Sequence, residues 1–257
     1  MEFTKYDDGQ PCWIDVCAPD PTATAAFYGA LLGWTVEPGP PETGGYANGT
    51  VGGKNVAGIA PQMQPGPSYW GTYIKVANVG ATLARVTDLG GSVLVPEMPV
   101  MDLGTMGIFT DPTGATLGLW APGTHIGAEL ANENGTWGWS ELLTRDVAAS
   151  KAFYTALFGW TVTEAEGPMQ YSEWQLAGRS IGGVMPMPEM VPAEVPPNWG
   201  VYFGVADVDA SVRKVRELGG AVFMEPTDIE PGRFAVVADP AGATFNLITM
   251  KPELTGS

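Results

Sequence analysis

The chain of 257 residues is poor in several side chains that commonly build reactive or charged sites. It contains one histidine, two cysteines and only 12 basic residues against 28 acidic ones, so its formal net charge is −16. No stretch approaches the ~20 consecutive apolar residues that a membrane-spanning helix needs. Because this negative charge repels the phosphates of nucleic acids and anionic lipids, we expect neither nucleic acid nor a membrane as a partner.

The two cysteines, Cys12 and Cys17, lie five positions apart (17 − 12 = 5). On a single strand their α-carbons would be ~16 Å apart, which is too far for a disulfide. Met1 to Gln10 are polar and acidic, so no signal peptide is expected. Free thiols without such a segment predict a cytoplasmic protein.

The chain contains a long internal repeat. The segment 27–34, FYGALLGW, returns at 153–160 as FYTALFGW, an offset of 126 residues (153 − 27). Four further pairs of segments recur in the same order: 20 and 146, 70–73 and 199–202, 89–91 and 218–220, and 111–116 and 239–244. So long a period indicates two copies of a whole domain. We predict domains at 1–121 and 137–257, joined by a linker at 122–136.

Each half contains the same succession of elements twice. A strand is expected at 11–17 and a helix at 22–32, followed by three short strands between 34 and 60 that glycine- and proline-rich turns separate. The same order is predicted over 70–120, 137–185 and 199–249. The chain is therefore predicted to be an α+β protein of four βαβββ modules.

Two motifs within these modules are specific in combination. Phe27-Tyr28 with Gly33-Trp34 follows the first strand, and Asp111-Pro112-Thr113-Gly114 precedes the last strand of the first domain. This arrangement resembles the vicinal oxygen chelate superfamily of glyoxalases, bleomycin-resistance proteins and extradiol dioxygenases, and in particular the tandem glyoxalase-like proteins of actinobacteria. The resemblance implies that two modules pair into one cup-shaped sheet, so we expect two cups.

The resemblance also implies where a divalent metal would bind on the floor of each cup. The residues at the corresponding positions are Trp13, Gly71 and Gly118 in the first domain, and Trp139, Gly200 and Asn246 in the second. Only the amide oxygen of Asn246 is a weak ligand, and the single histidine, His125, lies in the predicted linker. Asp15 or Glu141 would each stand nearly alone as a carboxylate ligand. We therefore predict no metal and no other cofactor.

Strand alternation places Trp13 with Asp15, and Trp139 with Glu141, on the face that would carry the metal. The remaining residues predicted to line the cups and bind a ligand are Tyr73, Lys75, Trp120, Tyr202 and Asn246. Asp15 and Glu141 are the candidate catalytic groups, because a carboxylate on a concave face is costly unless something pairs with it. Lys75 is the expected partner of Asp15. The alternative is that the aromatic residues only fill the cups.

An aromatic-lined cavity with one acid suits a small organic molecule, and a cation would gain attraction to the rings. We therefore predict metal-independent binding of an aromatic or cationic compound, of the drug-sequestration kind that the resemblance implies. One alternative is an enzyme, either a glyoxalase-like lyase or a tailoring enzyme of secondary metabolism, with Asp15 or Glu141 as acid–base. Another is a non-catalytic scaffold protein. A monomer or a homodimer is compatible with either.

Overall fold

The computed structural model describes residues 1–63, 65–165 and 170–251. The first domain comprises β1 (Pro11–Ala18), α1 (Pro21–Leu32), β2 (Thr35–Pro38), β3 (Ala47–Val51), β4 (Lys54–Pro61), β5 (Tyr69–Lys75), α2 (Val79–Asp88), β6 (Ser92–Val100), β7 (Gly104–Thr110) and β8 (Thr116–Pro122). A short 3-10 turn at Pro41–Thr43, which was not predicted, follows β2.

The second domain repeats this order. It comprises β9 (Trp137–Thr144), α3 (Val147–Phe158), β10 (Thr161–Glu164), β11 (Ser172–Leu176), β12 (Arg179–Pro186), β13 (Asn198–Gly204), α4 (Val208–Glu217), β14 (Ala221–Ile229), β15 (Gly232–Ala238) and β16 (Thr244–Met250). None of the helices in the described residues is long and apolar enough to cross a membrane.

Each domain forms one eight-stranded sheet from its two modules. The strand order is β2-β3-β4-β1-β5-β8-β7-β6 in the first domain and β10-β11-β12-β9-β13-β16-β15-β14 in the second. The modules meet at the centre of each sheet, where β1 pairs with β5 and β9 with β13, both antiparallel. The predicted α+β class with four βαβββ modules is confirmed.

The edge strands β6 and β14 each contain a proline, which a regular ladder would exclude. Pro96 and Pro226 instead lie at irregularities in the pairing, between Val95 and Met98 and between Met224 and Thr227. A proline is tolerated at a bulge of an edge strand, where its missing N–H interrupts no regular ladder.

The helices begin and end where the repeated sequence signals lie. Asp20 accepts hydrogen bonds from the backbone N–H groups of Thr22 and Ala23 at the start of α1, and Asp146 caps α3 by accepting one from Ala149. Gly33 and Gly159 end these helices in the left-handed conformation that glycine adopts without strain.

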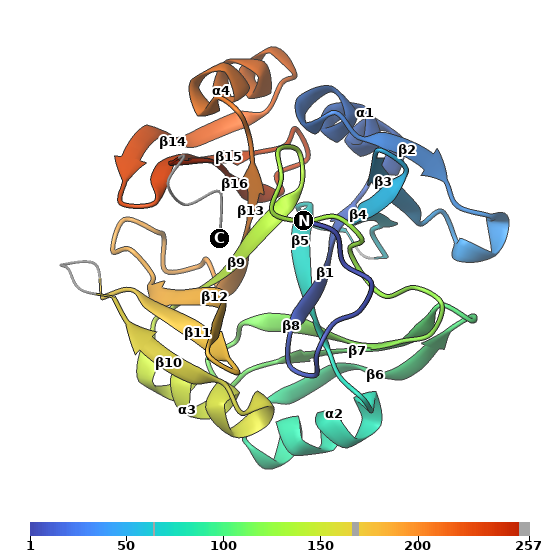
Figure 1. Cartoon of the computed structure of the whole chain (residues 1–257), viewed down its shortest axis with the longest axis vertical. Helices are drawn as coiled ribbons and strands as arrows, with labels where there is room; N and C mark the ends of the chain where they lie inside the picture. Colours follow the sequence, from blue (N-terminus) through green and yellow to red (C-terminus); the bar gives the residue numbers. More distant parts are fainter. Residues whose placement is uncertain (64, 166–169, 252–257) are drawn as a thin grey trace.

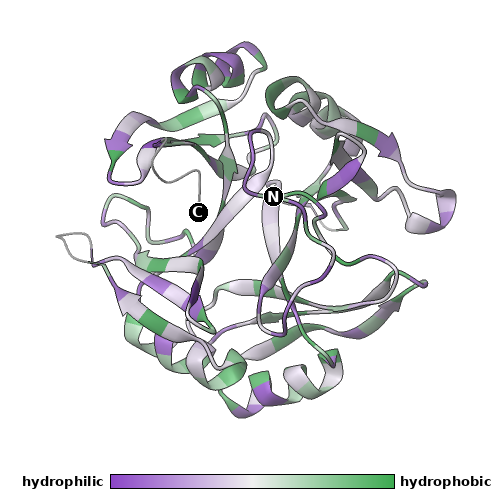
Figure 2. Ribbon diagram, in the orientation of Figure 1, coloured by the Kyte–Doolittle hydropathy of each residue, from purple (hydrophilic) through white to green (hydrophobic). Residues whose placement is uncertain are grey.

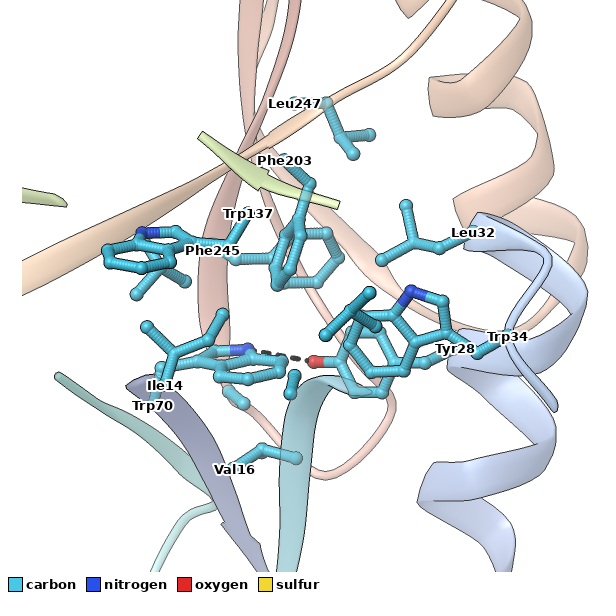
Figure 3. Packing of buried hydrophobic residues seen from close by; sticks show 14 of the residues in the cluster. Ile14, Val16, Tyr28, Leu32, Trp34, Trp70, Trp137, Phe203, Phe245 and Leu247 are labelled. Atoms are coloured by element: carbon cyan, nitrogen blue, oxygen red, sulfur yellow. Dashed lines mark hydrogen bonds between the residues drawn. The ribbon is translucent and has the colours of Figure 1, made fainter. Parts of the chain in front are cut away.

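The two sheets pack against each other through the faces opposite the cups. Ile14 and Trp70 of the first sheet belong to the same hydrophobic core as Phe203 and Phe245 of the second (Figure 3). The helices lie at the periphery, with α1 beside α4 and α2 beside α3 (Figure 1). Hydrophobic and hydrophilic residues are mixed along the outer strands and helices (Figure 2).

The repeated tryptophans join the two domains reciprocally. Trp34 Nε1 donates a hydrogen bond of 2.6 Å to the carbonyl oxygen of Gly135, and Trp160 Nε1 donates one of 2.7 Å to that of Gly9. Gly9 and Gly135 are themselves related by the repeat (135 − 9 = 126). Trp34 and Trp160 are 5% and 0% exposed, so both belong to the core.

Candidate ligand-binding cups

The pairing register brings the predicted residues to the centre of each sheet. Trp13 lies opposite Tyr73 across β1 and β5, and Asp15 lies opposite Gly71. The second domain repeats this register with Trp139 opposite Tyr202 and Glu141 opposite Gly200. Ile14 and Val16, the alternate residues of β1, point into the core between the domains (Figure 3). The predicted strand parity is therefore observed in the structure.

A buried carboxyl group lies between two phenols in the first cup. Trp13 Nε1 donates to the hydroxyl of Tyr46 at 2.8 Å, and that hydroxyl donates to Asp15 Oδ2 at 3.3 Å. The hydroxyl of Tyr73 donates to the same oxygen at 3.0 Å. Asp15 is only 5% exposed. We call these four residues the first acid cluster.

The second cup contains the equivalent set, the second acid cluster. Trp139 Nε1 donates to the hydroxyl of Tyr171 at 2.9 Å, and the hydroxyl of Tyr202 donates to Glu141 Oε1 at 3.0 Å. The nearby hydroxyl of Tyr171 also lowers the pKa of Glu141. Glu141 is 7% exposed. A tryptophan, two tyrosines and one acid thus recur in the same arrangement in both domains.

Tyr46 and Tyr171 were not predicted from the sequence. Both lie just before a strand, where the alternation of a strand does not extend. Each hydroxyl occupies the space above a glycine, because a Cβ on Gly58 or Gly183 would overlap it. The repeat carried the signal, since the tyrosines and the glycines are offset by the same number of residues (171 − 46 = 125 and 183 − 58 = 125).

Burial changes the acidity of both clusters. It raises the pKa of Asp15 to about 6 and that of Glu141 to about 7, while the hydrogen bonds from the tyrosines lower each value in part. The pKa values of Tyr46 and Tyr73 lie well above the ordinary value, chiefly because of burial and then because of Asp15. The phenols therefore remain protonated near neutral pH, and each acid is able to gain or lose a proton there.

Lys75 is not the partner of Asp15, so that expectation is wrong. Its ammonium lies 2.6 Å from Asp8 Oδ1, in the segment that precedes β1. It borders a pocket of about 350 Å³ near Lys5 and Ile126, outside the cup floor. The phenols of Tyr46 and Tyr73 take the place that the sequence assigned to Lys75.

The linker covers the first cup beside Trp13. Trp120 Nε1 donates to the carbonyl oxygen of His125 at 2.8 Å, and the His125 ring meets Trp13 edge-on with ring centroids 4.5 Å apart. The position that corresponds to His125 in the second domain, residue 253, lies outside the described residues. Trp139 is half-buried and borders a pocket of about 140 Å³ that Phe3 and Tyr6 also line.

The floors differ at one pair of corresponding positions. Gly118 lies opposite Tyr73, and a Cβ there would overlap the tyrosine ring. Asn246 takes this position in the second domain, where its Nδ2 donates to the carbonyl oxygen of Val201 at 3.2 Å. Asn246 thus lies on the second floor, with its amide hydrogen-bonded to the neighbouring strand.

Comparison with known families follows this architecture domain by domain. Residues 137–247 match the Glyoxalase/Bleomycin resistance protein/Dioxygenase superfamily, and residues 12–119 match the Glyoxalase-like domain. The chain belongs to the glyoxalase superfamily. The sequence-based resemblance to this superfamily is therefore confirmed.

Individual relatives extend over almost the whole glyoxalase-like chain. It is 41% identical over 262 residues to CFP32 of Mycobacterium tuberculosis (strain CDC 1551 / Oshkosh), which is named as a glyoxylase. The alignment covers 97% of this chain and 98% of the relative. It is 35% identical over 267 residues to the anthracycline biosynthesis protein DnrV of Streptomyces peucetius, covering 97% and 96%.

Solved structures share the fold at low identity. The Mn(II)-bound glyoxalase from Novosphingobium aromaticivorans has a TM-score of 0.65 at 15% identity and covers 94% of this chain and 82% of its own. The 2,3-dioxygenase LapB from Pseudomonas sp. KL28 has a TM-score of 0.61 at 15% identity and covers 96% of both chains.

The residues present do not fit the divalent metal that this fold family implies. Trp13 and Gly118 each lie opposite Tyr73, and Gly71 lies opposite Asp15. These positions offer an indole and two glycines. Among the described residues, no group of three or more histidine, cysteine, aspartate or glutamate side chains lies close enough to hold a metal. Each acid cluster instead surrounds one carboxyl with protonated phenols, which are poor ligands for such an ion.

Proposed function

We propose that this protein binds a small aromatic molecule in its cups and does so without a metal ion. The observation that supports the proposal is the acid cluster, whose tryptophan in each domain stands at a position where the resemblance implies a metal ligand. Tryptophan and tyrosine rings with a few polar groups are the usual lining of a site for a small organic ligand. Sequestration of such a compound requires no further chemistry.

An uncharged aromatic ligand agrees better with the acid clusters than the cation that the sequence also suggested. Burial raises the pKa of Glu141 to about 7 and that of Asp15 to about 6, so Glu141 is partly neutral near neutral pH and Asp15 becomes neutral in mildly acidic solution. The relative DnrV is named for the biosynthesis of anthracyclines, which are polycyclic aromatic compounds, and this supports the same ligand class.

A second candidate function is an enzyme that tailors an aromatic natural product, or a glyoxalase-like lyase. It is favoured by the same shifts in pKa, because a general acid–base works best when its pKa is close to the ambient pH. Asp15 and Glu141 would be the acid–base groups. Both cysteines are free, and with either function we place the protein in the cytoplasm.

The proposal is tested by fluorescence titration of EDTA-treated protein with a hydroxyanthraquinone such as quinizarin. Binding should quench tryptophan fluorescence equally with and without added Mn²⁺ or Zn²⁺. The double variant Trp13→Leu/Trp139→Leu should weaken binding at least about tenfold, as expected for the loss of ring contacts worth ~1.4 kcal/mol. Phe223→Leu, at a 67% exposed side chain of β14, is the control. Binding that requires added metal would contradict the proposal.

A further inference from the structure

The direction of the hydrogen bonds around Asp15 follows from the chemistry of the groups. The indole Nε1 of Trp13 is only a donor, so the hydroxyl oxygen of Tyr46 must accept from it. The proton of that hydroxyl is then directed to Asp15 Oδ2, 3.3 Å away. Tyr73 donates to the same atom at 3.0 Å. One oxygen of Asp15 therefore accepts the hydrogen bonds of both phenols.

The other oxygen of Asp15, Oδ1, takes no part in these contacts. It makes no hydrogen bond with any described residue, yet it is not among the fully buried polar atoms that lack a partner. Gly71 lies opposite Asp15 in the sheet, and a Cβ built there would be 3.1 Å from Oδ1. The missing side chain of Gly71 therefore keeps space open beside this atom.

We propose that in mildly acidic solution Asp15 is a neutral carboxylic acid with its proton on Oδ1, from which it donates a hydrogen bond to a ligand. This inference rests on the proposed function and names its ligand class. The partner is an aromatic ketone, a quinone or an enolate, each of which presents an oxygen that accepts a hydrogen bond. A carboxyl kept neutral in an apolar site can act as such a donor.

The surroundings of Asp15 agree with the neutral form. The titratable groups that face it are the phenols of Tyr46, Tyr73 and Tyr69 and the thiol of Cys17. Burial raises the pKa of Cys17 to about 11, so this thiol is uncharged near neutral pH. None of these groups is a cation. Burial disfavours the carboxylate, and the hydrogen bonds from Tyr73 and Tyr46 favour it to a lesser extent.

Three matched probes distinguish a donor from a carboxylate: acetonaphthone, ethylnaphthalene and naphthylethylammonium. Binding is measured by titration calorimetry at about pH 5 and about pH 8.5. The protein carries Trp139→Leu, which weakens binding in the second cup, so that the measured affinity is that of the first cup. At the lower pH the ketone should bind at least about tenfold more tightly than the hydrocarbon and the ammonium. This preference should be lost at the higher pH, where Asp15 ionises.

Three variants locate the donor. Asp15→Asn presents an N–H on the ligand side, so it should keep the ketone preference and lose its pH dependence. Asp15→Leu should remove the preference. Gly71→Ala, which leaves the acid intact but crowds Oδ1, should also reduce it. Glu37→Gln, an exposed acid on β2, is the control and should leave all values unchanged.

Ketone and hydrocarbon binding equally well at both pH values would overturn the inference and leave the proposed function standing. Tightest binding of the ammonium would also overturn it, because the carboxyl would then be ionised. Failure of all three probes to bind would overturn both. Should the leucine variant not fold, infrared titration of protein with an intact Asp15 decides the matter. The neutral carboxyl band must disappear as the pH rises through about 6, and Tyr73→Phe must shift it.

Discussion

The two cups are built on one plan and differ in what surrounds it. Each floor holds a tryptophan, two tyrosines and one acid in the same register. Around this set, the first cup has Gly118 and is covered by His125, whereas the second has Asn246 and a half-buried Trp139. The acid clusters therefore follow from the duplicated fold. The cover over each cup and the polar groups beside each cluster differ between the two domains.

The largest effect is expected at the reciprocal contacts between the domains. Trp34→Ala and Trp160→Ala each remove a buried aromatic ring and should lower the free energy of unfolding by about 3–5 kcal/mol. Trp160 should be the more costly, because it is 0% exposed against 5% for Trp34. Urea unfolding measures both. Loss of less than about 1 kcal/mol at either site would mean that the two contacts are not equivalent.

The next largest effect compares the two acids as the pH changes. Because burial raises both pKa values, the folded state binds more protons than the unfolded state above about pH 4. This contribution to stability is complete at low pH and is lost as the pH rises through about 6 for Asp15 and about 7 for Glu141.

Substituting each acid by its amide isolates this contribution. Glu141→Gln should remove a fall in stability on the order of 3 kcal/mol between acid and alkaline pH, at ~1.4 kcal/mol per pKa unit. Asp15→Asn should remove a similar fall that ends about one pH unit lower. Urea unfolding over about pH 4 to pH 8 provides the test. Parallel pH profiles for the protein and both variants would show that neither acid is perturbed.

A smaller effect is expected at the glycines below the tyrosines. Gly58→Ala and Gly183→Ala should each destabilise by about 1–3 kcal/mol, because the new methyl group overlaps the hydroxyl of Tyr46 or Tyr171. Gly58 should be the more sensitive, since its Cβ would also lie 2.9 Å from that of Asp15.

Pairing each glycine variant with its tyrosine variant identifies the cause. Adding Tyr46→Phe to Gly58→Ala should recover part of the loss in a double-mutant cycle. Gly66→Ala, at an exposed turn, is the control and should change stability by no more than about 0.5 kcal/mol. Simple additivity of the two changes would show that the hydroxyl is not the group that clashes.

The smallest effect tests the cover over the first cup. His125→Ala should cost about 1 kcal/mol or less, because it removes one edge-on ring contact with Trp13. It should also raise the fraction of tryptophan fluorescence that acrylamide quenches. This increase should be absent when Trp13→Phe is combined with His125→Ala. An unchanged quenching curve would mean that His125 does not shield Trp13.

Sequence reasoning predicted the framework well and the contacts of the acids poorly. The strand alternation of β1 and β9 placed Asp15 and Glu141 correctly on the face opposite the core. Tyr46 was missed because it reaches Asp15 from a part of the chain 31 positions away. Lys75 was wrongly assigned to Asp15, because its ammonium contacts Asp8 from a segment without a periodic pattern.

The alternation of a strand and the cap of a helix depend on residues that are close together in the chain. The repeat, the modules and the two faces of each strand could therefore be predicted from the sequence. The hydrogen bonds to Asp15 join residues that are 31 and 58 positions apart. The contact of Trp160 with Gly9 spans 151 positions. Contacts between residues so far apart in the chain form only once the sheets have formed and packed. The burial that raises the pKa of each acid arises at the same stage.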